Sequence, residues 1–96
     1  MYTVIETEEF SAWLDGLRDR TTKMRLTARL TKARLGNLGD AKPVGEGVFE
    51  MREFFGSGWR MYYVEQYGAI ILMLGGGDKS TQQQDIKRAI QLSKEL

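Results

Sequence analysis

Two arginines occupy positions from which neighbouring β-strands would project them onto one face of a sheet. Alternation along Val48–Phe55 assigns Arg52 to one face, and alternation along Trp59–Gln66 places Arg60 and Tyr62 on one side of the next strand. Guanidinium groups bind phosphate oxygens through a planar fork, and aromatic rings stack on unpaired bases. If the register of the two strands allows it, these three side chains form a platform for a polynucleotide.

The same residues also have a purely structural interpretation. Arg52 can pair with Glu50 or Glu65 across the sheet, and Tyr62 and Tyr63 can simply fill the core. Pattern alone favours this second interpretation, so the polynucleotide platform needs independent support.

A basic stretch precedes these strands. The chain has a net charge of only +1, but between Arg18 and Lys42 it carries eight basic residues against two acidic ones. The basic residues are Arg18, Arg20, Lys23, Arg25, Arg29, Lys32, Arg34 and Lys42. Such a stretch attracts a phosphate backbone, but it is equally typical of a solvated helix face or of a surface for an acidic protein.

A glycine-rich run, Gly75–Ser80, follows a predicted strand and opens a predicted helix. Backbone N–H groups and the helix dipole at such a place can hold an anion, with Lys79 beside it. The spacing is not that of a P-loop. A strand-to-helix turn that needs glycine explains the run more simply.

Composition excludes several classes of chemistry. The chain has no cysteine and no histidine, so we expect no disulfide, no thiol catalysis, no dedicated metal site and no cofactor. The first ten residues lack the pattern of a targeting signal, and no apolar run is long enough to span a bilayer. We therefore expect a cytoplasmic protein without a membrane segment.

The first half of the chain predicts a strand and two helices. Tyr2–Ile5 is β-prone, and Thr7 is a good N-cap for a helix that ends near Gly16–Asp19. A second helix is predicted over Thr21–Leu35, ended by the glycines that follow. Its packed face is predicted to carry Met24, Ala28, Thr31 and Leu35, and a different face to carry Arg25, Arg29 and Lys32.

The second half predicts a loop, three strands and a helix. Turn formers and the only proline make Asn37–Gly47 a predicted loop. The strands are expected at Val48–Phe55, Trp59–Gln66 and Ala69–Leu74, forming an antiparallel meander that Gly75–Asp78 ends. Ser80 and Gln83 are predicted to form a capping box for a helix whose inner side carries Ile86, Ala89, Ile90 and Ser93. The prediction is one α+β domain over residues 1–96, in the order β-α-α-β-β-β-α.

Three ordered motifs give a specific resemblance. The runs GDAKPVGEGVFEMR (Gly39–Arg52), GSGWRMYY (Gly56–Tyr63) and LGGGDKSTQQQDIKRA (Leu74–Ala89) resemble the addiction-module killer, HigB-like branch of the RelE/ParE toxin superfamily. The resemblance covers nearly the whole chain. It implies a RelE-like fold, in which a helical hairpin packs on a small, mainly antiparallel sheet. It also implies a toxin neutralised by a helix-turn-helix antitoxin, with operator DNA bound only through the complex of the two proteins.

The resemblance further implies an activity. RelE-type relatives cut messenger RNA in the ribosomal A site, where a ribose 2′-OH attacks the neighbouring phosphate. Carried over to this chain, Arg52, Arg60 and Lys79 match the catalytic cations. Lys42 becomes a backbone contact and Tyr62 a stacking ring, and the nucleic-acid surface extends to Arg25, Arg29 and Lys32.

One departure from the family pattern leaves alternatives open. RelE-type and HigB-type enzymes often place a tyrosine or histidine near the C-terminus for proton transfer, whereas this chain has Asp78-Lys79-Ser80-Thr81 there. Asp78 or Asp85 is a candidate base, although each also suits a helix start. One alternative function is therefore ParE-type inhibition of DNA gyrase, and another is binding of an antitoxin alone. Phe54, Phe55 and Trp59 are candidate docking points for that antitoxin, or ordinary core residues.

Overall fold

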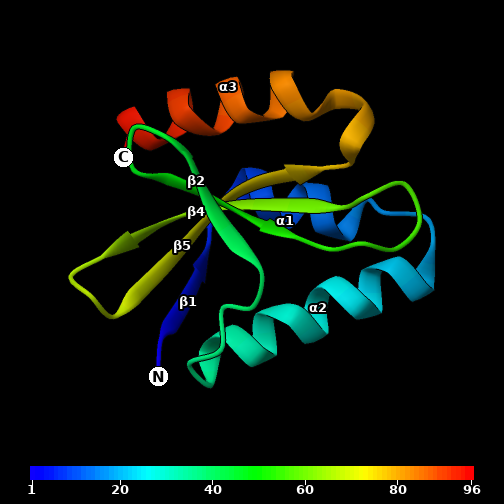
Figure 1. Ribbon diagram of the computed structural model, residues 1–96, viewed down its shortest axis with the longest axis horizontal. Helices are drawn as coiled ribbons and strands as arrows, with labels where there is room; N and C mark the ends of the chain where they lie inside the picture. Colours follow the sequence, from blue (N-terminus) through cyan, green and yellow to red (C-terminus); the bar gives the residue numbers. More distant parts are fainter.

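The computed structural model describes all 96 residues, and its centre is a five-stranded sheet (Figure 1). The strands are β1 (Thr3–Glu6), β2 (Ala41–Gly45), β3 (Val48–Arg52), β4 (Arg60–Gln66) and β5 (Ile70–Gly77). Their spatial order is β1-β5-β4-β3-β2, with β1 parallel to β5 and every other pair antiparallel. The helices are α1 (Glu8–Asp15), α2 (Arg20–Arg34) and α3 (Gln82–Lys94), with a short 3₁₀ helix at Lys79–Thr81. The α+β class and the mainly antiparallel sheet are as predicted.

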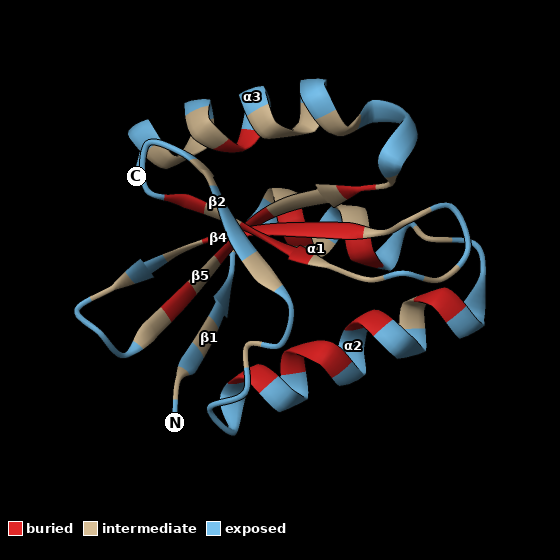
Figure 2. Ribbon diagram, in the orientation of Figure 1, coloured by how far each residue is buried: buried red, intermediate tan, exposed pale blue.

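The sheet separates two apolar clusters. On one face α1 and α2 bury Phe10, Leu14, Leu26, Leu30 and Ala33 against Met51, Met61, Tyr63, Ile71 and Met73. On the other face α3 packs Ala89 against Val48, Tyr62 and Leu74. Figure 2 shows the buried residues gathered along the middle strands and on the inward sides of the helices. No helix is both long enough and apolar enough to cross a membrane.

The start of α1 follows the prediction. The Thr7 hydroxyl oxygen accepts a hydrogen bond from the Phe10 N–H at 3.2 Å, as an N-cap does. The same hydroxyl donates to the Met73 carbonyl at 2.8 Å, so the cap also fixes α1 to β5. Glu8 and Glu9 lie in the first turn, where the helix dipole favours negative charge.

The packed face of α2 was predicted wrongly. Met24 is 65% exposed and Leu35 69% exposed, and Ala28 and Thr31 also face solvent. The face that packs on the sheet instead carries Thr22, Leu26, Arg29, Leu30 and Ala33. Leucines at 26 and 30 bury more apolar area than the Met24 and Ala28 pair, and the Thr22 hydroxyl and both Arg29 Nη groups form hydrogen bonds inside the protein.

The predicted loop Asn37–Gly47 contains a strand, so the order of elements is β-α-α-β-β-β-β-α and not the one predicted. The β2 strand pairs with β3, and its register shifts between Pro43 and Gly45. Proline offers no N–H to a ladder and glycine weakens a strand, but both are tolerated at a sheet edge or a bulge. β2 is an edge strand, which explains why its sequence resembles a loop.

The glycine run does not end the sheet. Gly75, Gly76 and Gly77 continue β5 and pair with Tyr62, Met61 and Arg60 of β4. Asp78 then caps the 3₁₀ helix by accepting the Ser80 N–H at 2.9 Å. The predicted capping box of Ser80 with Gln83 is therefore absent, because the Ser80 N–H and hydroxyl both bond to Asp78.

Candidate nucleic-acid interface

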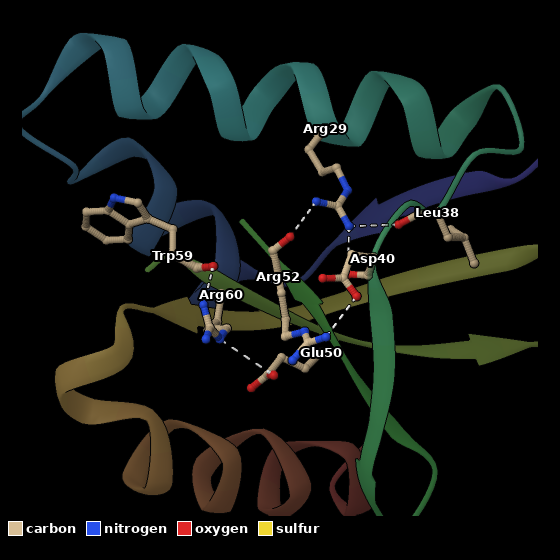
Figure 3. A network of polar contacts seen from close by, with 7 residues as sticks. All are labelled: Arg29, Leu38, Asp40, Glu50, Arg52, Trp59 and Arg60. Atoms are coloured by element: carbon tan, nitrogen blue, oxygen red, sulfur yellow. Dashed lines mark hydrogen bonds and ion pairs between the residues drawn. The ribbon is translucent and has the colours of Figure 1, made fainter. Parts of the chain in front are cut away.

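The register of the middle strands brings the two sheet arginines together. Arg52 of β3 lies directly opposite Arg60 of β4, and Glu50 lies opposite Tyr62. Opposed residues of an antiparallel pair share a face, so both arginines project to the α3 side of the sheet. Figure 3 shows their side chains running in the same direction, beside Glu50. The sequence-based expectation required this register.

Arg52 is the outer of the two arginines. Its guanidinium Nη2 lies 3.0 Å from Asp40 Oδ1, and 29% of its side chain is exposed. The guanidinium carbon also lies 5.4 Å from the centre of the Phe54 ring. Asp40 is therefore the partner of Arg52, in place of the expected Glu50 or Glu65. Because this ion pair is partly exposed, an incoming phosphate can compete for the arginine.

Arg60 is the inner arginine, and it is held by a buried carboxylate. Only 7% of its side chain is exposed, and its Nε lies 3.6 Å from Oε1 of Glu50, which is fully buried. Its Nη1 donates to the Trp59 carbonyl at 3.3 Å. The second Glu50 oxygen accepts from Gln82 Nε2 at 2.8 Å, which connects the pair to the start of α3. Arg60 is thus fixed in direction, with Nε left without a hydrogen-bond partner.

A hollow of about 300 Å³ opens beside Arg60, and we call it the Lys79 hollow. It is lined by Phe54, Gly56, Ser57, Gly58, Arg60 and Lys79. Arg60 and Lys79 both lie close to Gly58. A β-carbon added to this glycine would lie 3.4 Å from Arg60 Nη1 and 3.4 Å from Lys79 Cβ. Lys79 is exposed and forms no salt bridge. The hollow therefore combines a fixed guanidinium with a free ammonium.

The walls of the Lys79 hollow are tied together by hydrogen bonds. The Lys79 N–H donates to the Ser57 carbonyl at 3.2 Å, and the Ser57 hydroxyl donates to Asp78 Oδ2 at 2.9 Å. Hydrogen bonds from Ser80 and then from Ser57 lower the pKa of Asp78 below its ordinary value. Asp78 is therefore a helix cap and a weak base. Asp85, the second candidate base, accepts from the Thr81 hydroxyl at 2.6 Å.

Tyr62 does not have the position that base stacking requires. It is 0% exposed and packs beneath α3 with Val48 and Leu74. Burial first, and the charge of Glu50 second, raise the pKa of its hydroxyl well above the ordinary value. The expectation of a stacking role for Tyr62 is corrected by this placement, because its ring belongs to the core.

Arg29 is likewise a structural residue. Its guanidinium donates to the carbonyls of Arg52 at 2.8 Å, Leu38 at 3.0 Å and Asp40 at 2.9 Å (Figure 3). It also pairs with Glu53 at 3.2 Å. The side chain is 7% exposed. These bonds hold the loop after α2 against β3, and they explain why a polar face of the helix is buried. Arg29 is therefore not on the surface that was expected to bind nucleic acid.

The other predicted cations are exposed. Lys32 lines a second hollow, of about 250 Å³, together with Arg52 and Phe54, and we call it the Lys32 hollow. Lys42 lies opposite Glu50 on β2, so it shares the face of the two sheet arginines. The guanidinium carbon of Arg25 lies 4.6 Å from the centre of the Phe55 ring, and Arg25 lines neither hollow. The structure thus brings Lys32, Lys42, Arg52, Arg60 and Lys79 around one region of the sheet.

Two residues of this region had been assigned other roles from the sequence, Glu50 as a possible partner of Arg52 and Phe54 as a candidate docking point for an antitoxin. Glu50 orients Arg60, and its place on the arginine face follows from strand alternation, although its choice of partner does not. Phe54 is 72% exposed and lines both hollows, whereas Phe55 and Trp59 pack against the core. Only the coordinates distinguish these three aromatic residues.

The chain has a relative of similar length among known proteins. No protein-family model matches it. A Haemophilus influenzae protein described as uncharacterised is 44% identical over 87 residues, which are 91% of this chain and 88% of that protein. The two chains belong to one family. The similarity extends over nearly the whole length of both chains.

The fold of the family is also found in a solved structure. A chain of the intact E. coli RelBE toxin–antitoxin complex superposes with a TM-score of 0.66, over 81% of this chain and 96% of that chain. The sequence identity is 16%, so the likeness is one of fold. The expected RelE-like fold is confirmed for this member of the family, apart from the order of elements corrected above.

Proposed function

We propose that this chain is the toxin of a type II toxin–antitoxin pair, of the HigB-like branch of the RelE/ParE superfamily, and that it cuts messenger RNA on the ribosome. Its fold supports a toxin role by analogy with the RelBE complex. The three ordered motifs described above support the branch. A helix-turn-helix antitoxin is the proposed partner, and operator DNA is bound only through the complex of toxin and antitoxin.

The observation that carries the proposal is the Lys79 hollow. Arg60 is buried and its Nε is held toward Glu50, while Lys79 forms no salt bridge and lies, like Arg60 Nη1, close to Gly58. Arg52 adds a third cation from the neighbouring strand. A guanidinium that is already oriented stabilises a developing phosphate charge without the cost of reorganisation.

The proposed reaction is an internal transesterification of RNA. The ribose 2′-oxygen attacks the adjacent phosphorus, the bond from phosphorus to the 5′-oxygen breaks, and the products are a 2′,3′-cyclic phosphate and a 5′-hydroxyl. Arg60 and Arg52 stabilise the additional charge of the phosphorane, and the Lys79 ammonium donates a proton to the leaving oxygen. Water accepts the proton of the 2′-hydroxyl, and the Lys79 amine regains a proton from solvent.

Two observations favour a second function, ParE-type inhibition of DNA gyrase. The Asp78 carboxylate, a candidate base, caps a helix and has a lowered pKa, and the Tyr62 hydroxyl is buried. A surface that only binds its target needs no proton acceptor. The same cations would then contact the gyrase–DNA complex without cutting RNA.

One experiment tests both functions. The chain is expressed under tight control, with and without its antitoxin, while transcript 5′ ends are mapped and gyrase supercoiling is measured. Codon-phased cleavage supports the endonuclease, and inhibited supercoiling with intact transcripts contradicts it in favour of gyrase inhibition.

A matched pair of variants tests the Lys79 hollow. Lys79→Ala removes an exposed cation that has no salt bridge, and Lys87→Ala removes another exposed lysine, on α3 and outside the hollow. We expect the first variant to lose cleavage by about 100-fold or more, as for loss of a general acid. The second should cleave like the parent. Equal cleavage by the two variants would remove Lys79 from the mechanism.

A further inference from the structure

Phe54 is an exposed aromatic side chain set between two basic hollows. It belongs to the loop of residues 53–59, which joins β3 to β4, and 72% of it is exposed. The Lys79 hollow lies on one side of it and the Lys32 hollow on the other, and Phe54 lines both. A single exposed apolar side chain is ordinary by itself, but one that lines two hollows with basic residues is placed to contact a ligand held there.

The ring is held in place by its neighbours. The Arg52 guanidinium carbon lies 5.4 Å from the ring centre, and the same guanidinium is fixed by Asp40. The cation–π contact orients the ring at little entropic cost to a later ligand. Because most of the side chain remains exposed, a second flat group can contact it.

The charges around Phe54 indicate what kind of group this is. Arg60 and Lys79 lie in the Lys79 hollow, which has no acidic lining residue. The Lys32 hollow is lined by three cations, Arg29, Lys32 and Arg52, and by the carboxylates of Asp40 and Glu53, so it has one positive charge in excess. A single-stranded polynucleotide alternates anionic phosphates with flat bases, so it matches an aromatic ring between two cationic hollows. A duplex keeps its bases stacked inside and does not match.

We propose that an unpaired RNA base stacks on Phe54, and that the two hollows take the phosphates on either side of that base. This inference rests on the RNA-binding function proposed above and assigns to Phe54 the positioning of the strand. It replaces the stacking role first expected of Tyr62, which is buried.

The other exposed aromatic residue lacks these surroundings. Tyr67 is 92% exposed, but it lies in the β4–β5 turn and lines no hollow with a basic residue. Phe55 is covered by Arg25 and packs against the core, and Trp59 packs against Trp13 with ring centres 6.3 Å apart. Tyr67 is therefore a matched control for exposure without charge.

The test uses the purified chain and a short single-stranded RNA that contains the fluorescent base 2-aminopurine. We expect Phe54→Ala to weaken binding by about 5- to 150-fold, the range for loss of one stacked base. It should also remove the quenching of 2-aminopurine. Phe54→Tyr should restore both, and Tyr67→Ala should behave like the parent.

Salt dependence separates stacking from charge. Phe54→Ala should leave the slope of log Kd against log salt unchanged, because the phosphate contacts remain. Lys79→Ala should flatten that slope by about 0.7, the value for one contact to a single strand. The same RNA in duplex form should bind without any dependence on Phe54.

The outcomes distinguish this inference from the proposed function. If the parent binds no RNA, this inference fails, while the cleavage of transcripts on the ribosome is tested separately by the mapped 5′ ends. If the parent binds RNA and Phe54→Ala binds it equally well, the stacking role fails and RNA binding survives. If Phe54→Ala loses affinity only for the antitoxin, Phe54 is a protein anchor and the inference is overturned.

Discussion

Arg60 and Glu50 form an ion pair inside the protein, with 3.6 Å between Nε and Oε1. Neither side chain exposes more than 7% of its surface. Removing one partner of a buried pair leaves the other charge uncompensated, whereas replacing both by neutral groups costs far less. This asymmetry allows the structural role of Arg60 to be separated from its role toward RNA.

We expect Arg60→Ala alone to lose growth arrest and also to destabilise the protein by about 3 to 5 kcal/mol, because Glu50 remains buried and charged. The double variant Arg60→Met with Glu50→Gln should recover most of that stability, since Gln82 can still donate to the residue at position 50. Urea denaturation measures the stability and induced expression measures the arrest. A double variant as toxic as the parent would exclude Arg60 from the mechanism.

Gly39 and Gly68 provide a matched pair of substitutions. Both have left-handed backbones, with φ of 65° and 68°, so alanine costs about 1 kcal/mol at either site from the backbone alone. A β-carbon at Gly39 would also lie 2.8 Å from Arg29 Nη2, whereas one at Gly68 meets nothing within 4 Å. Gly39→Ala should therefore lose about 2 kcal/mol more than Gly68→Ala, through the displaced Arg29 bonds. Thermal or chemical denaturation checks the difference, and equal losses would mean that Arg29 adapts freely.

Gly76 and Gly75 test why β5 ends in glycines. A methyl group at Gly76 would overlap the Trp13 indole, whereas one at Gly75 meets nothing within 4 Å. Gly76→Ala should destabilise the protein by about 1 to 3 kcal/mol, as overpacking does. Gly75→Ala should be neutral or gain about 0.5 kcal/mol, because alanine suits a strand better than glycine. The two denaturation midpoints report the result, and a Gly76→Ala protein as stable as the parent would contradict the tight contact with Trp13.

Tyr62→Phe tests the buried hydroxyl. This hydroxyl has no hydrogen-bond partner, so its removal should leave stability within about 1 kcal/mol of the parent or raise it. The pKa of Tyr62 is raised in the folded state, so the folded protein keeps a proton that the unfolded chain loses. The contribution of the protonated Tyr62 hydroxyl to the stability of the fold is complete below about pH 10, the pKa of tyrosine in an unfolded chain. It is lost as the pH rises further.

Denaturation at a series of alkaline pH values checks this sign. The free energy of unfolding of the parent should fall more steeply above pH 10 than that of Tyr62→Phe. Identical slopes would show that Tyr62 ionises as easily in the folded protein as in the unfolded chain.

Periodicity was sufficient for much of the fold. The alternation of β3 and β4, the Thr7 cap and the extents of α1 and α2 all depend on local rules, and the structure follows them. The α2 face was wrong because the pattern offers two apolar stripes, and packing chose the stripe with Leu26 and Leu30. A buried arginine at position 29 is not visible in a pattern that assigns charge to the surface.

Tertiary partners decided the remainder. The β2 strand contains Pro43 and lies in a glycine-rich segment, which does not predict a strand. Its pairing with β3 alone makes it one. The glycines of β5 read as a break, but Trp13 packs on Gly76 and requires a bare backbone there. Likewise, pairing of Arg60 with Glu50 and of Arg52 with Asp40 depends on strands that the sequence does not align by itself.

The outermost strand has a consequence for the protein in crowded solution. β2 presents its free side to solvent, but Pro43 offers no N–H, the ladder is irregular at that point, and the neighbouring Lys42 carries a charge. A continuous row of donors and acceptors is what recruits a strand from another molecule, and this row is interrupted. This border of the sheet is therefore protected against edge-to-edge polymerisation by Lys42 and by Pro43, the same proline that led to the prediction of a loop.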